Sequence, residues 1–120
     1  MSAGFEKLIV WQRAMRLVRR VYLLTKTFPH DEKFGLTSQM RRAAVSVPSN
    51  LAEGHARTGP REFKRFVSNA QGSLAEVLTQ IHVAIDLEYV RRKDTARLLD
   101  EIDQVGRMLN SLRQSLISNL

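Results

Sequence analysis

The sequence predicts an all-α fold: an antiparallel up-down-up-down four-helix bundle with a proline-kinked second helix, built as one domain over residues 1–120. Apolar residues recur at helical spacing in four long segments. Glycine and proline mark two of the three breaks between these segments, and a basic run marks the third. No segment shows the alternating pattern of a half-buried strand, which leaves a bundle as the simplest architecture.

The first helix is expected over residues 7–28, a stretch without glycine or proline. Two apolar series cover about half of its circumference, which is wider than the ~100° stripe of an ordinary surface helix. This width predicts that the helix also contacts a second copy of the chain. Its polar side carries a strip that must face water or a polyanion: Gln12, Arg13, Arg16, Arg19, Arg20 and Lys26. Pro29 ends the helix, because the residue before a proline avoids the helical region.

The second helix is expected over residues 36–55 with a kink near Pro48, since proline lacks a backbone N–H and crowds the carbonyl four residues earlier. Its polar residues follow one another at steps of four, four and three: Arg42, Ser46, Asn50 and Glu53. This spacing places them in one stripe along the helix, which a solvated surface would not require.

After a loop over residues 54–59, Pro60 is expected as the first residue of the third helix, which ends near Tyr89. Residues 91–93 form a basic connection, and the fourth helix follows from about Asp94. Its apolar residues repeat in alternating steps of four and three, the heptad seam of a bundle.

The polar stripe of the second helix also predicts a partner. If the second and third helices form an antiparallel hairpin, Arg42 lies level with Glu76, and Ser46 lies near Ser73. We expect Arg42 and Glu76 to form a partly buried ion pair that holds the kinked hairpin, and removing either partner to cost about 2–5 kcal/mol. A ligand-binding role for the same residues is the alternative.

The charge of the chain favours a nucleic-acid partner. The net charge is +7 and the pI is near 10.6. Residues 1–75 hold 13 basic and 5 acidic residues, a net charge of +8, whereas residues 76–120 hold 6 and 7, a net charge of −1. Because the aromatic residues lie on apolar stripes, phosphate contacts are expected rather than base stacking. The candidate nucleic-acid-binding residues are Arg13, Arg16, Arg20, Arg61, Lys64 and Arg65.

Residue types argue against the common catalytic and metal sites. The chain has no cysteine, its three histidines stand apart, and no Glu-x-x-His pair is present for a di-iron centre. No serine has a histidine at helical spacing, and no glycine-rich phosphate loop is present. We therefore expect a non-enzymatic protein with no catalytic residue, metal or cofactor. An enzyme with an unrecognised site is a remaining alternative.

Targeting signals are also absent from the sequence. The first residues lack a basic segment followed by an apolar run, and no stretch approaches the ~20 apolar residues of a membrane-spanning helix. We expect a cytoplasmic protein without a membrane partner.

Two motifs carry a resemblance to a known family. Residues 41–54 (RRAAVSVPSNLAEG) and 70–76 (AQGSLAE) resemble signatures of the small four-helix-bundle proteins encoded by intervening sequences of bacterial 23S ribosomal RNA genes. Residues 5–11 and 28–39 resemble the opening and first connection of that family. Its relatives include the accessory proteins of diversity-generating retroelements, which form basic pentameric barrels that bind nucleic acid and a reverse transcriptase. The resemblance thus implies a homopentamer, a nucleic-acid partner and a reverse transcriptase or other protein partner.

Two non-enzymatic functions compete. The leading one is a basic homo-oligomeric bundle that binds RNA or serves as a scaffold or accessory protein of a nucleoprotein complex. The other is a structural protein–protein interaction oligomer without nucleic-acid binding, whose arginines keep it soluble. Salt-dependent binding to RNA would separate them.

Overall fold

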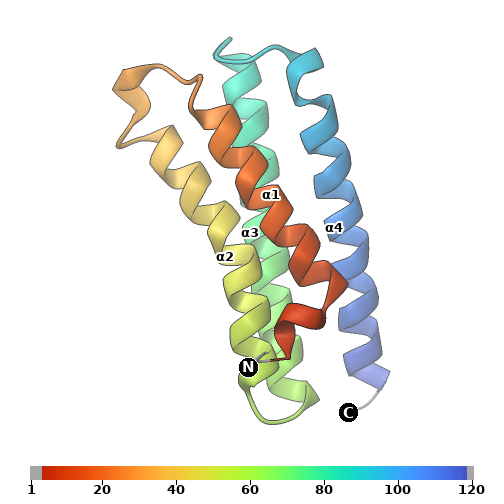
Figure 1. Ribbon diagram of the computed structural model, residues 1–120. Coiled ribbons are helices and arrows are strands. Elements are labelled where there is room, and N and C mark those ends of the chain that lie inside the picture. The colour runs from red at the N-terminus through yellow and green to blue at the C-terminus, as the bar shows by residue number, and fades with distance from the viewer. Residues whose placement is uncertain (1–3, 119–120) are drawn as a thin grey trace.

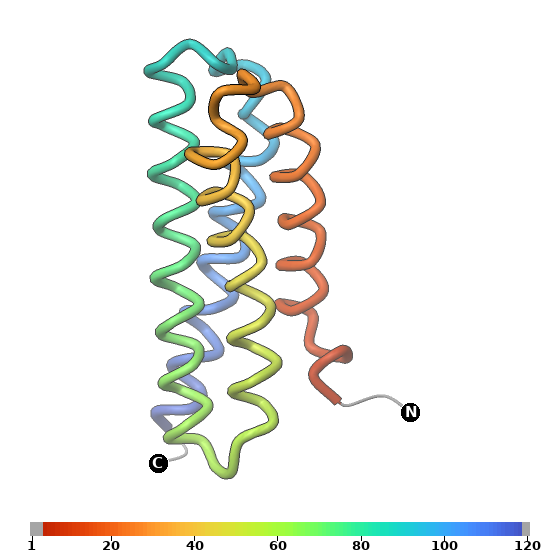
Figure 2. The backbone as a smooth tube through the Cα atoms, turned by 90° about the vertical axis from the view of Figure 1, so that its left-hand side faces the viewer, coloured from red at the N-terminus to blue at the C-terminus, as the bar shows by residue number. Residues whose placement is uncertain are grey.

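In the computed structural model, which describes residues 4–118, four long α-helices form a bundle (Figure 1). They are α1 (Ile9–Thr25), α2 (Leu36–Ala56), α3 (Pro60–Asp86) and α4 (Arg92–Ser118), and two short 3-10 helices, η1 (Phe5–Lys7) and η2 (His30–Glu32), precede α1 and α2. Figures 1 and 2 show consecutive helices running in opposite directions. The predicted all-α class is confirmed. Residues 1–3, the start of the segment considered for a secretory signal, and residues 119–120 lie outside the described range.

The helices are arranged as a square. α1 packs against α2 and α4, and α3 packs against the same two helices, whereas no Cα atom of α1 lies within 8 Å of one in α3. The bundle therefore has four sides, each made by two adjacent helices, which we call the α1/α2, α2/α3, α3/α4 and α1/α4 sides. The largest fully buried side chains come from all four helices: Leu17, Met40, Leu51, Ile81 and Leu109.

The first helix is shorter than its apolar spacing predicts. α1 ends at Thr25, and the backbone N–H groups of Thr27 and Phe28 donate to carbonyls only three residues earlier. Such bonds tighten the last turn and satisfy carbonyls that would otherwise lack donors. Phe28 is still buried, with its ring centre 5.7 Å from that of Tyr89. Apolar spacing therefore continues past the point where the α-helix ends.

The third helix also ends before the predicted residue, Tyr89. The N–H of Tyr89 donates to the Ala84 carbonyl and that of Glu88 to the Ile85 carbonyl, the two bonds of a Schellman cap. Glu88 has a φ of 62°, a left-handed conformation that usually belongs to glycine. α4 then begins at Arg92, so Arg92 and Lys93 lie in its first turn rather than in the connection.

Pro48 lies inside α2, as predicted, and the helix continues through it. The side-chain amide of Asn50 donates to the Ser46 carbonyl at 2.8 Å and to the Ser46 hydroxyl at 2.9 Å. These bonds add support in a part of the helix that lacks the proline N–H. The size of the kink stays a prediction.

The second and third helices approach closely near their connection. A Cβ atom on Gly54 would lie 2.6 Å from the Cβ of Phe66, so only glycine fits this position without displacing α3. Gly59, with a φ of +86°, then makes the turn into α3.

A polar contact joins the two connections at the opposite end of the bundle, which Figure 2 shows lying together. The Tyr89 hydroxyl donates to Glu32 Oε2 at 2.7 Å, and the backbone N–H of Leu36 donates to Glu32 Oε1 at 3.0 Å. The bond from Tyr89, followed by that from Leu36, lowers the pKa of Glu32. The bond to Glu32 raises the pKa of Tyr89. We call this contact the Glu32–Tyr89 clasp.

Among residues 4–118, no helix has both the length and the apolar character needed to cross a bilayer.

Candidate functional site

Two of the arginines predicted to bind nucleic acid, Arg13 and Arg20, contact α4. Arg20 Nε lies 2.6 Å from Glu101 Oε1, and the two side chains are 30% and 15% exposed. Arg13 Nη1 donates to Gln104 Oε1 at 2.7 Å. The prediction that the strip faces only water or a polyanion is therefore wrong for Arg13 and Arg20. The polar side of α1 is wide enough that its edge packs against α4.

The other α1 arginines face outward. Arg16 and Arg19 are exposed, and neither forms an ion pair or a hydrogen bond through its side chain within residues 4–118. α1 carries four arginines and no acidic residue. Its outward ridge is therefore positive without local compensation.

The predicted α3 residues lie near the α2–α3 turn. Arg65 Nε is 2.8 Å from Glu62 Oε2, and its guanidinium carbon lies 4.6 Å from the ring centre of Phe66. Arg61 is exposed and Lys64 is half-buried, and neither forms an ion pair in the described part of the chain. The six predicted residues are divided between α1 and α3, two helices that are diagonal in the square and do not pack against each other.

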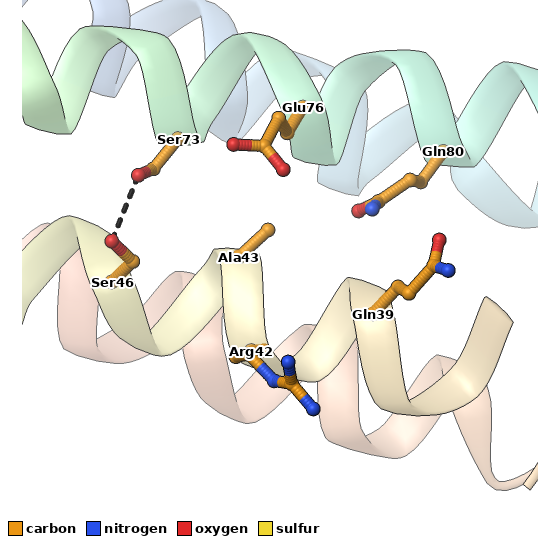
Figure 3. Close-up of a pocket in the computed structure, with 7 residues that line it drawn as sticks. All are labelled: Gln39, Arg42, Ala43, Ser46, Ser73, Glu76 and Gln80. Carbon is orange, nitrogen blue, oxygen red and sulfur yellow. Dashed lines mark hydrogen bonds between the residues drawn. The ribbon is translucent and has the colours of Figure 1, made fainter. Parts of the chain in front are cut away.

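The polar stripe of α2 faces α3 at its centre. The hydroxyl oxygens of Ser46 and Ser73 lie 2.8 Å apart, in agreement with the hairpin register expected from the sequence (Figure 3). Farther along α2, Glu53 pairs at 3.0 Å with Arg57, the residue that follows the last residue of the helix, and both side chains are about half exposed. The stripe thus contains one bridge to α3 and one ion pair at the surface.

The predicted ion pair between Arg42 and Glu76 is wrong. Both side chains are exposed, no ion pair joins these two described residues, and Figure 3 shows Arg42 pointing away from Glu76. The register was predicted correctly, but register does not fix the direction of a long side chain. An exposed pair gains little Coulomb energy and costs side-chain entropy, so a solvated arginine competes well with a paired one.

A polar cleft of about 260 Å³ opens between α2 and α3 beside the two serines. Its lining residues are Gln39, Arg42, Ala43, Ser46, Ser73, Glu76 and Gln80. Gln80 Oε1 is buried and accepts no hydrogen bond within the described structure. Gln39 and Gln80 were not predicted as site residues, although each extends a polar stripe by one turn: Gln39 precedes Arg42 by three residues and Gln80 follows Glu76 by four.

The α1/α2 and α3/α4 sides are apolar. On the α1/α2 side, Met15 and Val45 are 44% and 40% exposed beside a depression of about 290 Å³ that Trp11 and Pro48 also line. On the α3/α4 side, a groove of about 430 Å³ is lined by five aliphatic or small residues and four polar ones: Leu74, Ala75, Leu78, Ile102 and Gly106, with Gln71, Asp103, Arg107 and Asn110. These two sides lie opposite each other in the square.

Comparison with known proteins identifies the family. A profile of the 23S rRNA-intervening sequence protein family matches residues 6–111. The chain belongs to this family. The matched range contains both motifs on which the sequence resemblance depends, residues 41–54 and 70–76. The name of the 23S rRNA-intervening sequence protein family connects it with ribosomal RNA.

A search of curated proteins gave no match. Among the described residues, no group of three or more histidine, cysteine, aspartate or glutamate side chains is placed to hold a metal ion.

Proposed function

We propose that this protein is a non-enzymatic, homo-oligomeric RNA-binding scaffold of the cytoplasm. The observation that carries the proposal is the uncompensated charge of α1, on which Arg16 and Arg19 face outward without a partner among the described residues. The connection of the family with ribosomal RNA supports RNA as the polyanion. The protein partner implied by the resemblance, a reverse transcriptase or another protein of a nucleoprotein complex, belongs to the same proposal.

The geometry favours contact with phosphates. Guanidinium groups on an outward ridge can approach a phosphate backbone, but they cannot enclose a base. Arg61 and Lys64 offer a second, smaller site near the α2–α3 turn. The proposed RNA contacts do not include Arg13 and Arg20, because Gln104 and Glu101 accept hydrogen bonds from their guanidinium groups.

The apolar α1/α2 and α3/α4 sides support assembly. A soluble monomer gains nothing from keeping Met15, Val45 and Leu78 exposed at 44%, 40% and 37%, whereas contact between copies would bury them. The resemblance to the pentameric accessory proteins of diversity-generating retroelements implies that the oligomer has five subunits. Assembly would repeat the α1 ridge around the oligomer and raise the affinity for long RNA through multivalency.

The test is a titration of the protein into a 23S rRNA fragment and into an unrelated RNA of equal length, at several salt concentrations. The variant replaces Arg16 and Arg19 by glutamine. We expect the slope of log affinity against log salt to become shallower by about 1.4–1.8, which corresponds to two lost phosphate contacts at ~0.7–0.9 each. The two RNAs should bind with similar affinity, since phosphate contacts carry no sequence information.

The matched control replaces Arg57 and Arg91 by glutamine, which removes the same charge. Arg57 pairs with Glu53 at 3.0 Å and Arg91 with Asp94 at 3.0 Å, so the control should retain more of the parent slope than the α1 variant. Equal loss in both variants would assign the effect to net charge rather than to the α1 ridge. Undetectable RNA binding at about 50 mM salt, where screening is incomplete, would contradict the proposal.

One observation favours the purely structural alternative. Two of the four α1 arginines hold α1 to α4, which shows that arginine serves packing in this bundle. If the protein assembles normally but does not bind RNA, the structural oligomer is the correct interpretation.

A further inference from the structure

The cleft on the α2/α3 side contains two acceptor groups, on Glu76 and Gln80, that no donor of the described residues satisfies. The Glu76 carboxylate forms no ion pair or hydrogen bond within residues 4–118. Gln80 Oε1 is buried, with no donor in the described structure. A buried acceptor without a donor costs free energy, and a ligand that donates hydrogen bonds would recover it.

The shape of the cleft limits what can enter. The Ser46–Ser73 hydrogen bond closes one end, and the side chains of Gln39 and Gln80 face each other at the other end (Figure 3). Ala43, which is 6% exposed, lies between these ends on α2. At about 260 Å³ the cleft is smaller than the ~300–1,000 Å³ typical of pockets for drug-sized ligands, which favours a small group over a whole nucleotide.

The charges point to a cation. Glu76 directs its carboxylate into the space between the helices, while Arg42 projects from the rim away from it (Figure 3). An anion would therefore meet a carboxylate before it met a guanidinium. A divalent metal ion is also disfavoured, because Glu76 is the only histidine, aspartate or glutamate that lines the cleft.

We propose that this cleft binds a guanidinium group. A guanidinium is planar, carries five N–H donors and pairs with a carboxylate through two parallel hydrogen bonds. The guanidinium would donate two hydrogen bonds to the Glu76 carboxylate, and its remaining N–H groups could donate to Gln80 Oε1 and the serine hydroxyls. It is also more weakly hydrated than an ammonium, so it enters a partly enclosed site at lower cost. The group comes either from a free small molecule or from an arginine side chain of a second copy of this chain.

The first experiment titrates ethylguanidinium and ethylammonium into the full-length protein by calorimetry at constant ionic strength. We expect saturable binding of ethylguanidinium that is at least about fivefold tighter than that of ethylammonium, because only the planar group pairs bidentately. Glu76→Gln should lower the affinity for ethylguanidinium by about tenfold or more. Glu76 is exposed, so the substitution should leave the fold intact, as circular dichroism can check.

Two control variants sharpen this result. Glu53→Gln makes the same chemical change on an exposed residue outside the cleft, so the affinity should not change. Arg42→Gln removes a like charge from the rim, so ethylguanidinium should bind equally well or more tightly. Weaker binding of ethylguanidinium to Arg42→Gln would mean that Arg42 helps to hold the ligand rather than repelling it, and the proposal would be wrong.

The second experiment distinguishes the two sources by sedimentation. If the group belongs to a second copy, Glu76→Gln and an excess of ethylguanidinium should both reduce the assembled mass, and Glu53→Gln should not. If it belongs to a free molecule, the mass should stay constant while ethylguanidinium binds. If ethylguanidinium shows no saturable binding and the assembled mass does not change, the proposal is overturned, whatever the result with RNA.

Discussion

The arginines of α1 differ in what their guanidinium groups contact. Arg13 and Arg20 reach side chains of α4, whereas Arg16 and Arg19 reach solvent. The same residue type therefore serves packing on one edge of the helix and carries free charge on its outward ridge. No feature of α1 alone distinguishes the two pairs, because the distinction depends on how the helix is rotated about its axis.

The Arg20–Glu101 pair gives a prediction about stability. Glu101→Ala should destabilise the protein by about 1–3 kcal/mol, because Arg20 is 30% exposed and would lose its charged partner. Urea unfolding at a fixed protein concentration measures the effect. The control is Asp103→Ala, whose partner Arg107 is 80% exposed and whose loss should cost no more than about 0.5 kcal/mol. Equal costs in the two variants would show that the Arg20–Glu101 pair adds nothing.

The left-handed residue at the end of α3 gives a second prediction. Glu88→Gly should stabilise the protein by about 0.5–1 kcal/mol, because glycine adopts the φ of 62° without a Cβ penalty, although it loses more entropy on folding. Thermal unfolding is the measurement. Glu88→Ala keeps a Cβ and removes the same charge, so it should give no comparable gain. A gain in both variants would attribute the effect to charge rather than to the backbone.

At the level of helices, spacing predicted which segments are helical but not where each one ends. Val10 and Leu98 belong to the apolar series of the first and fourth helices, and both are buried, as apolar side chains at helical spacing should be. The end of α3 had no such signal, because a glutamate occupies the position that usually holds glycine. Hydrogen bonds between residues far apart in the sequence could not be predicted either, such as the one between Tyr89 and Glu32, which are 57 residues apart.

The Glu32–Tyr89 clasp predicts how stability depends on pH. The pKa of Glu32 in the folded protein is below the ordinary value of 4.5, so the stability that Glu32 contributes is present above that pH and is lost as the pH falls through the folded value. The pKa of Tyr89 is above the ordinary value of 10.0, so the stability that Tyr89 contributes is present below that pH and is lost as the pH rises through the folded value.

Tyr89→Phe should therefore be less stable than the parent between about pH 5 and 9, with the difference narrowing toward both extremes. Urea unfolding over a pH series measures this difference. Tyr22→Phe is the control, since the Tyr22 hydroxyl makes no hydrogen bond within residues 4–118. A difference between parent and Tyr89→Phe that stays constant with pH would show that the phenyl ring, not the hydroxyl, is responsible.

For the whole molecule, the order of helices around the square follows from the short connections, but the functional surfaces do not. The wide apolar face of α1 predicts a contact outside its own bundle. It did not indicate which arginines would face α4, nor that Gln39 and Gln80 would complete a cleft. Those features depend on helix rotation and side-chain direction, which the periodicity of a single helix leaves open.

Assembly gives the fourth prediction. Substitution of both Met15 and Val45 by glutamate should reduce the sedimentation mass to that of one 13.7 kDa chain, because charge would enter an apolar contact. Circular dichroism should remain helical. Leu87→Glu is the control, since Leu87 is 51% exposed at the α3–α4 connection and lines neither apolar side. A parent that already sediments as a single chain at micromolar concentration would contradict the oligomer.

The two apolar sides lie on opposite faces of the molecule, and we call the α1/α2 side the front and the α3/α4 side the back. A two-fold dimer through the α1/α2 side would leave both α3/α4 sides in water, so a dimer does not finish the assembly. Contact of the front of one copy with the back of the next covers both, but such head-to-tail growth stops only when the copies close into a ring. The angle between successive copies then decides between a ring and a fibre. A substitution that fills the groove beside Gly106 would change this angle, and electron microscopy should then show filaments.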